Sequence, residues 1–102
     1  YLGGAIYKIP IIIDGFISAV AALGACKINP LVKDYILPSH VSKEPAGRLI
    51  LEELGLKPLL NLEMCLGEGS GAIALMPILE LACEVYNKMS NFNEFGFEYV
   101  PL

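Results

Sequence analysis

Residues 8–15 read KIPIIIDG, and this stretch decides the fold of the chain. The run from Ile11 to Ile13 is a continuous series of β-branched residues that does not alternate with polar ones. Such runs are typical of strands covered on both faces, as in parallel sheets. The run stops at Asp14-Gly15, and an apolar, alanine-rich stretch of helical length follows from Phe16 to Cys26. We therefore predict a buried strand and then a helix whose small residues let it pack closely on the sheet.

A second strand and helix are predicted further along the chain. Asn29-Pro30 is typical of an N-cap followed by proline at the first helical position, so a short helix is expected up to Tyr35. The residues from Tyr35 to Leu37 predict a second strand. This order of strand, helix, strand and helix implies an α/β architecture with a parallel sheet and flanking helices.

Two more helices are expected in the rest of the chain. Ser42 is predicted to cap a helix from Glu44 to Leu54, and Gly55 suits the position just past its end. The buried stripe of this helix is expected at Leu49, Ile50 and Leu54. The longest helix is expected from Ser70 or Gly71 to about Met89, and its broad apolar face would hold Ala72, Leu75, Leu79, Ala82, Val85, Tyr86 and Met89.

The composition favours a piece of a larger protein. Of the 102 residues, 55% are hydrophobic and 18% charged, whereas typical domains have about 45–50% and 25%. The excess of apolar residues predicts faces that meet either missing sequence or a second subunit. Because the chain begins with Tyr1 and not with methionine, we expect a C-terminal fragment.

Charge and hydropathy exclude two classes of partner. The formal net charge is -4 and the basic residues are scattered, so we expect no binding to nucleic acid. The longest charge-free runs, Gly15 to Cys26 and Gly69 to Leu79, are shorter than the about 20 residues that a membrane helix needs. The three cysteines are widely spaced and odd in number, which is typical of a reducing compartment and indicates the cytoplasm.

The first candidate site is Asp14-Gly15, at the predicted carboxyl end of the first strand. Ligands of α/β proteins bind at such strand ends. Asp14 could bind a ribose hydroxyl or orient another side chain, or it could cap the helix that follows. The sequence leaves both interpretations open.

The second candidate site is residues 38–42, PSHVS, where a strand end again meets a helix start. Free backbone N–H groups there favour an anion such as phosphate, and Ser42 could add its hydroxyl. The alternative is that Ser42 is a plain N-cap. His40 has no second histidine or paired cysteines near it, so a metal site is not expected, and a structural histidine hydrogen-bonded to the backbone is favoured.

The third candidate site is residues 67–71, GEGSG. Glycine permits positive φ angles and lets a ligand approach the backbone closely. The stretch matches neither of the common glycine-rich nucleotide motifs. A carboxylate presented on a tight turn can accept a proton, which makes Glu68 a candidate catalytic base. Alternatively, Glu68 is a surface residue of a helix-entry turn.

Together these motifs carry a resemblance to a known family. Residues 13–18 (IDGFIS), 37–44 (LPSHVSKE) and 66–72 (LGEGSGA) are similar, in order and spacing, to motifs of nicotinate-nucleotide–dimethylbenzimidazole phosphoribosyltransferase. The resemblance covers essentially the whole chain. It implies a glycosyltransferase of the lower-ligand branch of cobalamin synthesis, with the chain as the C-terminal part of a longer enzyme.

The resemblance implies a reaction and a set of site residues. Phosphoribose would pass from nicotinate mononucleotide to 5,6-dimethylbenzimidazole, with Glu68 as the general base. Asp14, Gly15 and Ser42 match positions near the nucleotide, and Leu66 and Gly67 match backbone that borders the pocket. The scheme needs no metal and no cofactor. The family's main phosphate loop would lie outside this chain, so the chain alone is expected to be inactive.

The resemblance also implies an architecture. Residues 1–75 would belong to a large, Rossmann-like α/β catalytic domain, and residues 76–102 would be a long helix and tail leading into a small helical domain. The assembly implied by the family is a homodimer. Two other functions stay open: a homologous enzyme that uses another base, and a non-catalytic α/β module that binds a nucleotide.

Overall fold

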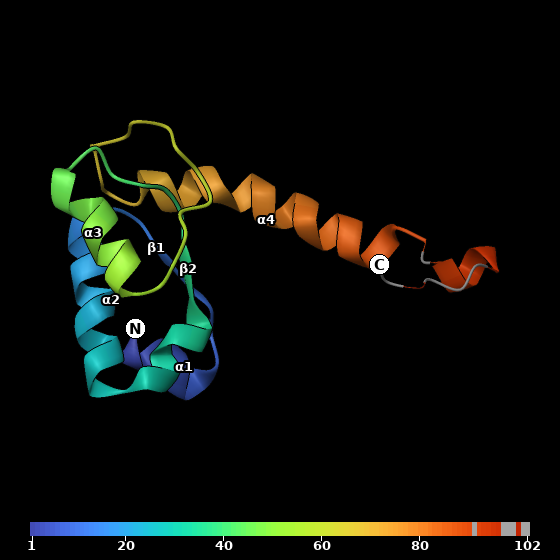
Figure 1. The fold of residues 1–102 in the computed structure, drawn as a ribbon, viewed down its shortest axis with the longest axis horizontal. Helices are drawn as coiled ribbons and strands as arrows, with labels where there is room; N and C mark the ends of the chain where they lie inside the picture. Colours follow the sequence, from blue (N-terminus) through green and yellow to red (C-terminus); the bar gives the residue numbers. More distant parts are fainter. Residues whose placement is uncertain (91, 97–99, 101–102) are drawn as a thin grey trace.

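A two-stranded parallel sheet lies at the centre of the fold. The computed structural model describes residues 1–90, 92–96 and 100. Strand β1 (Ile11–Ile13) pairs with β2 (Ile36–Pro38), and Ile12 lies opposite Leu37 (Figure 1). The connection between the strands is formed by α2 (Phe16–Ile28) and the 3-10 helix η1 (Pro30–Tyr35). The predicted α/β fold with a parallel sheet and flanking helices is therefore confirmed.

The small residues of α2 let it pack closely, as predicted. Ala19, Ala22 and Ala25 are its buried residues, and they repeat at the three-residue spacing of one helix face. This face belongs to a core that also holds Ile13 and Val32. The predicted cap at the following helix is also confirmed, because the Asn29 side chain accepts a hydrogen bond from Leu31 N and Pro30 takes the first helical position.

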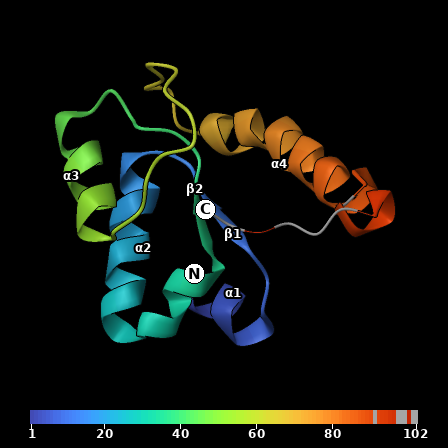
Figure 2. The same cartoon turned by 45° about the vertical axis from the view of Figure 1, so that its right-hand side comes forward.

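Helix α3 (Pro45–Glu53) lies beside α2 in Figures 1 and 2. The prediction that Ser42 caps it is wrong: the N-cap is Glu44, and Ser42 Oγ instead accepts a bond from Glu44 N at 3.3 Å in the preceding turn. The predicted stripe is wrong at Leu49, which is 65% exposed, whereas Leu51 is 3% exposed. Leu51 and the C-cap residue Leu54 enter the core, and the buried Gly47 lies against Ser42.

The end of α3 follows the prediction. Gly55 has a φ of +64°, and its N–H donates to Glu52 O. The N–H of Leu56 donates to Leu51 O at 2.8 Å. These two bonds are the Schellman arrangement, which requires a left-handed residue just past the helix and therefore favours glycine there.

Helix α1 (Leu2–Tyr7) was not predicted, because Gly3 and Gly4 lower its helix propensity. Packing explains why position 4 is a glycine. A Cβ at this position would overlap the Ile11 side chain, so the glycine lets α1 lie directly against β1. Tertiary contact thus overrides local propensity in this segment.

The longest helix, α4 (Ser70–Lys88), begins and ends as predicted and continues through Pro77. It projects away from the sheet in both ribbon views (Figures 1 and 2), and its buried residues are Gly71 and Leu75 at the near end. The radius of gyration is 16.4 Å, whereas a compact domain of about 100 residues has about 13 Å. Most of the predicted apolar face is therefore exposed.

The division at residues 75 and 76 stays a prediction. Beyond α4, a short 3-10 helix η2 (Phe92–Phe95) follows, and residues 91, 97–99 and 101–102 of the predicted tail lie outside the described residues. Within the described part of the chain, no helix combines the length and apolar character needed to cross a membrane.

The two leucines of α3 provide a matched test of the fold. We expect Leu51→Ala to lower the free energy of unfolding by about 2–5 kcal/mol, because it leaves a cavity in the core. Leu49→Ala, on the exposed face of the same helix, should change it by less than about 0.5 kcal/mol. Urea unfolding of the full-length protein, followed by circular dichroism, measures both. An equal loss of unfolding free energy in both variants would contradict the observed orientation of α3, with Leu51 facing the core and Leu49 facing solvent.

Candidate active site

A pocket of about 570 Å³ lies at the carboxyl ends of β1 and β2. This volume is within the usual range for small-molecule sites. The pocket is lined by all six residues that the sequence singled out: Asp14, Gly15, Ser42, Leu66, Gly67 and Glu68. Three segments far apart in the sequence therefore meet at one place: the ends of the two parallel strands, where ligands of α/β proteins bind, and the loop before α4.

Other lining residues were not identified from the sequence as pocket residues. They are Tyr1, Phe16, Ile17, Ser18, Ala21, His40, Glu44 and Cys65. Phe16 to Ser18 belong to the motif of residues 13–18 that carries the family resemblance, but they were not assigned to the pocket. Tyr1 and Cys65 carry no local signal, since they reach the pocket only through the folding of α1 and the loop before α4.

The loop that holds Glu68 has an unusual backbone. Gly67, Glu68 and Gly69 have consecutive positive φ angles of +75°, +55° and +80°. The two glycines adopt this conformation freely, but Glu68 carries a Cβ and is sterically disfavoured there, at a cost of about 1–2 kcal/mol. Non-glycine residues held in such conformations cluster at functional sites. The side chain of Glu68 is exposed at the pocket.

The carboxylate of Asp14 anchors this loop. Its Oδ2 accepts a hydrogen bond from Gly69 N at 3.0 Å. Its Oδ1 accepts bonds from Gly71 N at 2.8 Å and Ala72 N at 3.2 Å. These N–H groups belong to the start of α4, whose N-cap Gly69 has no side chain to satisfy them. Asp14 thus caps a helix more than fifty residues away along the chain, and not the adjacent α2, whose N-cap is Gly15.

Ser39 and His40 form a buried layer beneath the loop, with 0% and 4% of their surfaces exposed. Ser39 Oγ donates to the backbone oxygen of Asp14 at 3.0 Å. The Nδ1 atom of His40 lies 3.0 Å from the same hydroxyl. The expectation that His40 bonds to the backbone is therefore wrong, because its partner is the neighbouring side chain.

Gly71 is required by this layer. A Cβ at Gly71 would overlap Nδ1 and Cε1 of the His40 ring and would lie 2.9 Å from Asp14 Oδ1. The last glycine of the GEGSG motif therefore allows the first turn of α4 to rest directly on the imidazole. It serves packing, whereas Gly67 and Gly69 serve the backbone conformation.

The Tyr1 phenol lies at the edge of the same pocket. Burial raises the pKa of Tyr1, the Ser18 hydroxyl opposes this rise, and the charge of Asp14 adds to it. The Tyr1 phenol is therefore protonated at neutral pH. Ser18 Oγ donates to Gly15 O and accepts from Asp14 N, each at 2.9 Å, which holds the turn between β1 and α2.

The fold and pocket define the class: an α/β protein with a pocket at its strand ends and a carboxylate on a strained glycine loop. The family model described as "Phosphoribosyltransferase" matches residues 1–96. The chain therefore belongs to the nicotinate-nucleotide–dimethylbenzimidazole phosphoribosyltransferase family, the name that its curated relatives carry.

Two of these relatives and one solved structure illustrate the similarity. The protein of Clostridium acetobutylicum is 55% identical over the whole of this chain, and that of Escherichia coli strain SMS-3-5 is 53% identical over 86% of it. The crystal structure of the enzyme of that name from Thermus thermophilus is 41% identical over 98% of this chain, with a TM-score of 0.88. The chain spans 29% of the length of the Clostridium protein, 24% of that of the E. coli protein and 30% of the Thermus chain.

Removal of the Asp14 carboxylate tests its role as a cap. We expect Asp14→Ala to lower the free energy of unfolding by about 1.5–3 kcal/mol, the range for hydrogen bonds to a charged group. Amide hydrogen exchange in the peptide covering residues 66–72 should also accelerate. The control is Asp34→Ala, at an exposed aspartate of η1, which should leave both quantities unchanged. Unaltered exchange in Asp14→Ala would show that the loop is held by other contacts.

Proposed function

We propose that the full-length protein transfers phosphoribose from nicotinate mononucleotide to 5,6-dimethylbenzimidazole, in the lower-ligand branch of cobalamin synthesis. The products are α-ribazole 5'-phosphate and nicotinate. Family membership supports the reaction class, and the conformation of Glu68 is the observation that supports its role. A glutamate at a φ of +55° between two glycines is strained without compensating packing, since its side chain is exposed.

In the proposed reaction Glu68 is the general base. Its carboxylate accepts the N–H proton of the benzimidazole, and the other ring nitrogen then attacks the anomeric carbon. A new C–N bond forms as the bond to nicotinate breaks, and the electron pair of the broken bond neutralises the positive nicotinate ring nitrogen. Attack from the opposite face converts the β configuration to α. Holding the two reactants in line supplies much of the remaining rate enhancement.

The proposed nucleotide contacts lie around the start of α2. Gly15 is its N-cap and, within the described residues, no side chain caps this helix end. Such an end presents free N–H groups to an anion, here the phosphate or the carboxylate of the nucleotide. Ser42 also lines the pocket, and its hydroxyl is available to donate. Asp14 contributes by placing the loop, and Leu66 and Gly67 form the border beside Glu68.

We also propose that the protein is a homodimer of the cytoplasm. Large apolar side chains on α4, such as Ile73, Leu81 and Tyr86, are 61–88% exposed. A surface of this kind supports burial against another chain or segment. The three cysteines are free, which supports a reducing compartment.

Substitution of Glu68 tests the proposed base. In the full-length protein, nicotinate release from nicotinate mononucleotide and dimethylbenzimidazole should fall by roughly 10²–10⁴ in Glu68→Gln. The control Glu63→Gln alters an exposed glutamate that also has a positive φ, +51°, but does not line the pocket, and it should retain full turnover. A rise in KM alone in Glu68→Gln would indicate a binding role. Activity with another base but not with dimethylbenzimidazole would favour a homologous transferase.

Substitution Glu68→Gly should abolish turnover without lowering the stability of the fold. Because this change removes a steric cost of about 1–2 kcal/mol, the thermal midpoint should stay equal or rise while turnover is lost. Differential scanning calorimetry and the nicotinate assay measure the two quantities. A clear loss of stability would mean that contacts of the Glu68 side chain stabilise the fold, and its strained conformation would then not be evidence for a catalytic role.

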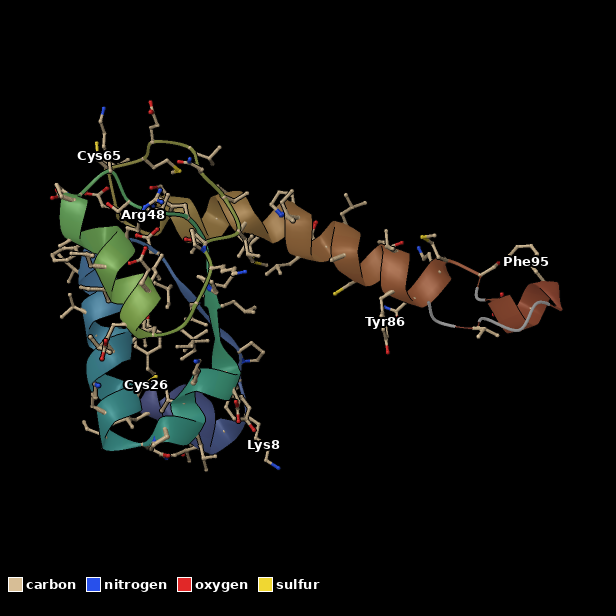
Figure 3. The ribbon with its side chains drawn as sticks, viewed as in Figure 1. Lys8, Cys26, Arg48, Cys65, Tyr86 and Phe95 are labelled. Atoms are coloured by element: carbon tan, nitrogen blue, oxygen red, sulfur yellow. The ribbon has the colours of Figure 1, made fainter. Side chains whose placement is uncertain are left out.

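Alkylation of cysteines reports on occupancy of the pocket. Cys65 lines the pocket, whereas Cys83 is exposed on α4, away from it (Figure 3 labels Cys65 and Cys26). Saturating nicotinate mononucleotide should slow iodoacetamide labelling of Cys65 and leave Cys83 unaffected. Burial raises the pKa of Cys26, partly opposed by Lys33, so it holds less thiolate at neutral pH and should react more slowly than both. Peptide mass spectrometry gives the three rates, and equal protection of Cys65 and Cys83 would argue against binding in this pocket.

A further inference from the structure

His40 has one ring nitrogen whose protonation is determined by its neighbours. The hydroxyl of Ser39 carries a single proton, which it donates to Asp14 O because a carbonyl oxygen can only accept. Towards His40 the same hydroxyl can therefore only accept, and Nδ1 must carry the proton of that bond. In the neutral imidazole, Nε2 is then an unprotonated acceptor.

This acceptor has no partner within the described residues. The hydrogen bonds of His40 comprise only the one at Nδ1. Every fully enclosed side-chain nitrogen or oxygen in the described chain has a partner. Nε2 is therefore not fully enclosed, although the residue as a whole is only 4% exposed. Because His40 lines the pocket, its bare Nε2 can accept a hydrogen bond from a bound ligand that presents a donor.

We propose that His40 is a specificity-determining residue of the pocket, whose Nε2 accepts a hydrogen bond from a ribose hydroxyl of the nucleotide. The inference rests on the proposed function and follows from the donors that the two substrates possess. Dimethylbenzimidazole has one N–H, which is assigned to Glu68. The nicotinate carboxylate has no proton to donate, and the phosphate is largely doubly ionised at neutral pH. The two ribose hydroxyls are the donors that remain.

Two substitutions test the roles of the two ring nitrogens of His40 one at a time. In His40→Asn the side-chain amide can replace Nδ1 as the donor to Ser39, but nothing replaces Nε2. In His40→Gln the longer amide can replace the acceptor at Nε2, while the bond to Ser39 is lost. The substrates are nicotinate mononucleotide and its 2'-deoxy and 3'-deoxy analogues, tested with dimethylbenzimidazole and the full-length protein.

The measured quantity is the ratio of kcat/KM between the nucleotide and each analogue. Comparing this ratio among variants cancels the intrinsic effect of the missing hydroxyl on reactivity. We expect His40→Asn to reduce the ratio for one hydroxyl by roughly 3- to 10-fold, the contribution of a neutral hydrogen bond, and to leave the other ratio unchanged. His40→Gln should stay closer to wild type. Both ratios unchanged in His40→Asn, with activity reduced equally on all substrates, would overturn the proposal.

A second measurement depends on neither turnover nor the folding of His40→Asn. In the ¹⁵N spectrum of histidine-labelled wild-type protein, assigned by comparison with His40→Gln, Nδ1 should be protonated and Nε2 bare. Saturation with nicotinate mononucleotide should shift the Nε2 resonance, and the relevant deoxy analogue should not. A proton on Nε2, or no shift on saturation, would overturn the assignment. If wild-type protein shows the shift but releases no nicotinate, the contact stands and the proposed reaction fails.

Discussion

The hydrogen bonds between the Asp14 carboxylate and the first turn of α4 are the constraint on which the site depends. They join the end of strand β1 to a loop more than fifty residues further along the chain. A negative side chain at a helix N-terminus satisfies the unpaired N–H groups and complements the helix dipole. Because one carboxylate holds three N–H groups, the loop carrying Glu68 is fixed relative to the sheet and cannot adjust independently of it.

The residues beneath the hydrogen bonds of the Asp14 carboxylate explain why the loop can hold Glu68 in a strained conformation. Ser39 binds the backbone of Asp14, His40 binds Ser39, and Gly71 rests on the His40 ring. Each contact removes a way in which the turn could relax. A residue with a positive φ persists only where its surroundings leave no alternative, and this buried polar layer provides that condition for Glu68.

The shape of the chain agrees with the finding that it matches only part of the length of its relatives. The sheet has two strands, and α4 projects from it (Figure 1). Large apolar side chains remain exposed on α4, among them Tyr86, which Figure 3 labels. The relatives are more than three times as long as the part that this chain matches. The pocket at the strand ends is likewise open to solvent. Its described lining offers a carboxylate, an uncapped helix end and a hydroxyl, but no lysine or arginine to balance a phosphate.

The sequence by itself predicted both strands and every helix from α2 to α4, but not α1. The isoleucine run predicted a buried strand, Asn29-Pro30 predicted a cap, and the glycines around Glu68 predicted a turn, because each signal depends on residues that are neighbours in the chain. Tertiary structure decided what depends on distant neighbours. Asp14 caps α4 and not α2, Leu51 and not Leu49 enters the core, and Ser42 lines the pocket and does not cap α3. A carboxylate bonds to whichever N–H groups the fold brings to it, and no local pattern shows that these belong to a helix beginning at Ser70.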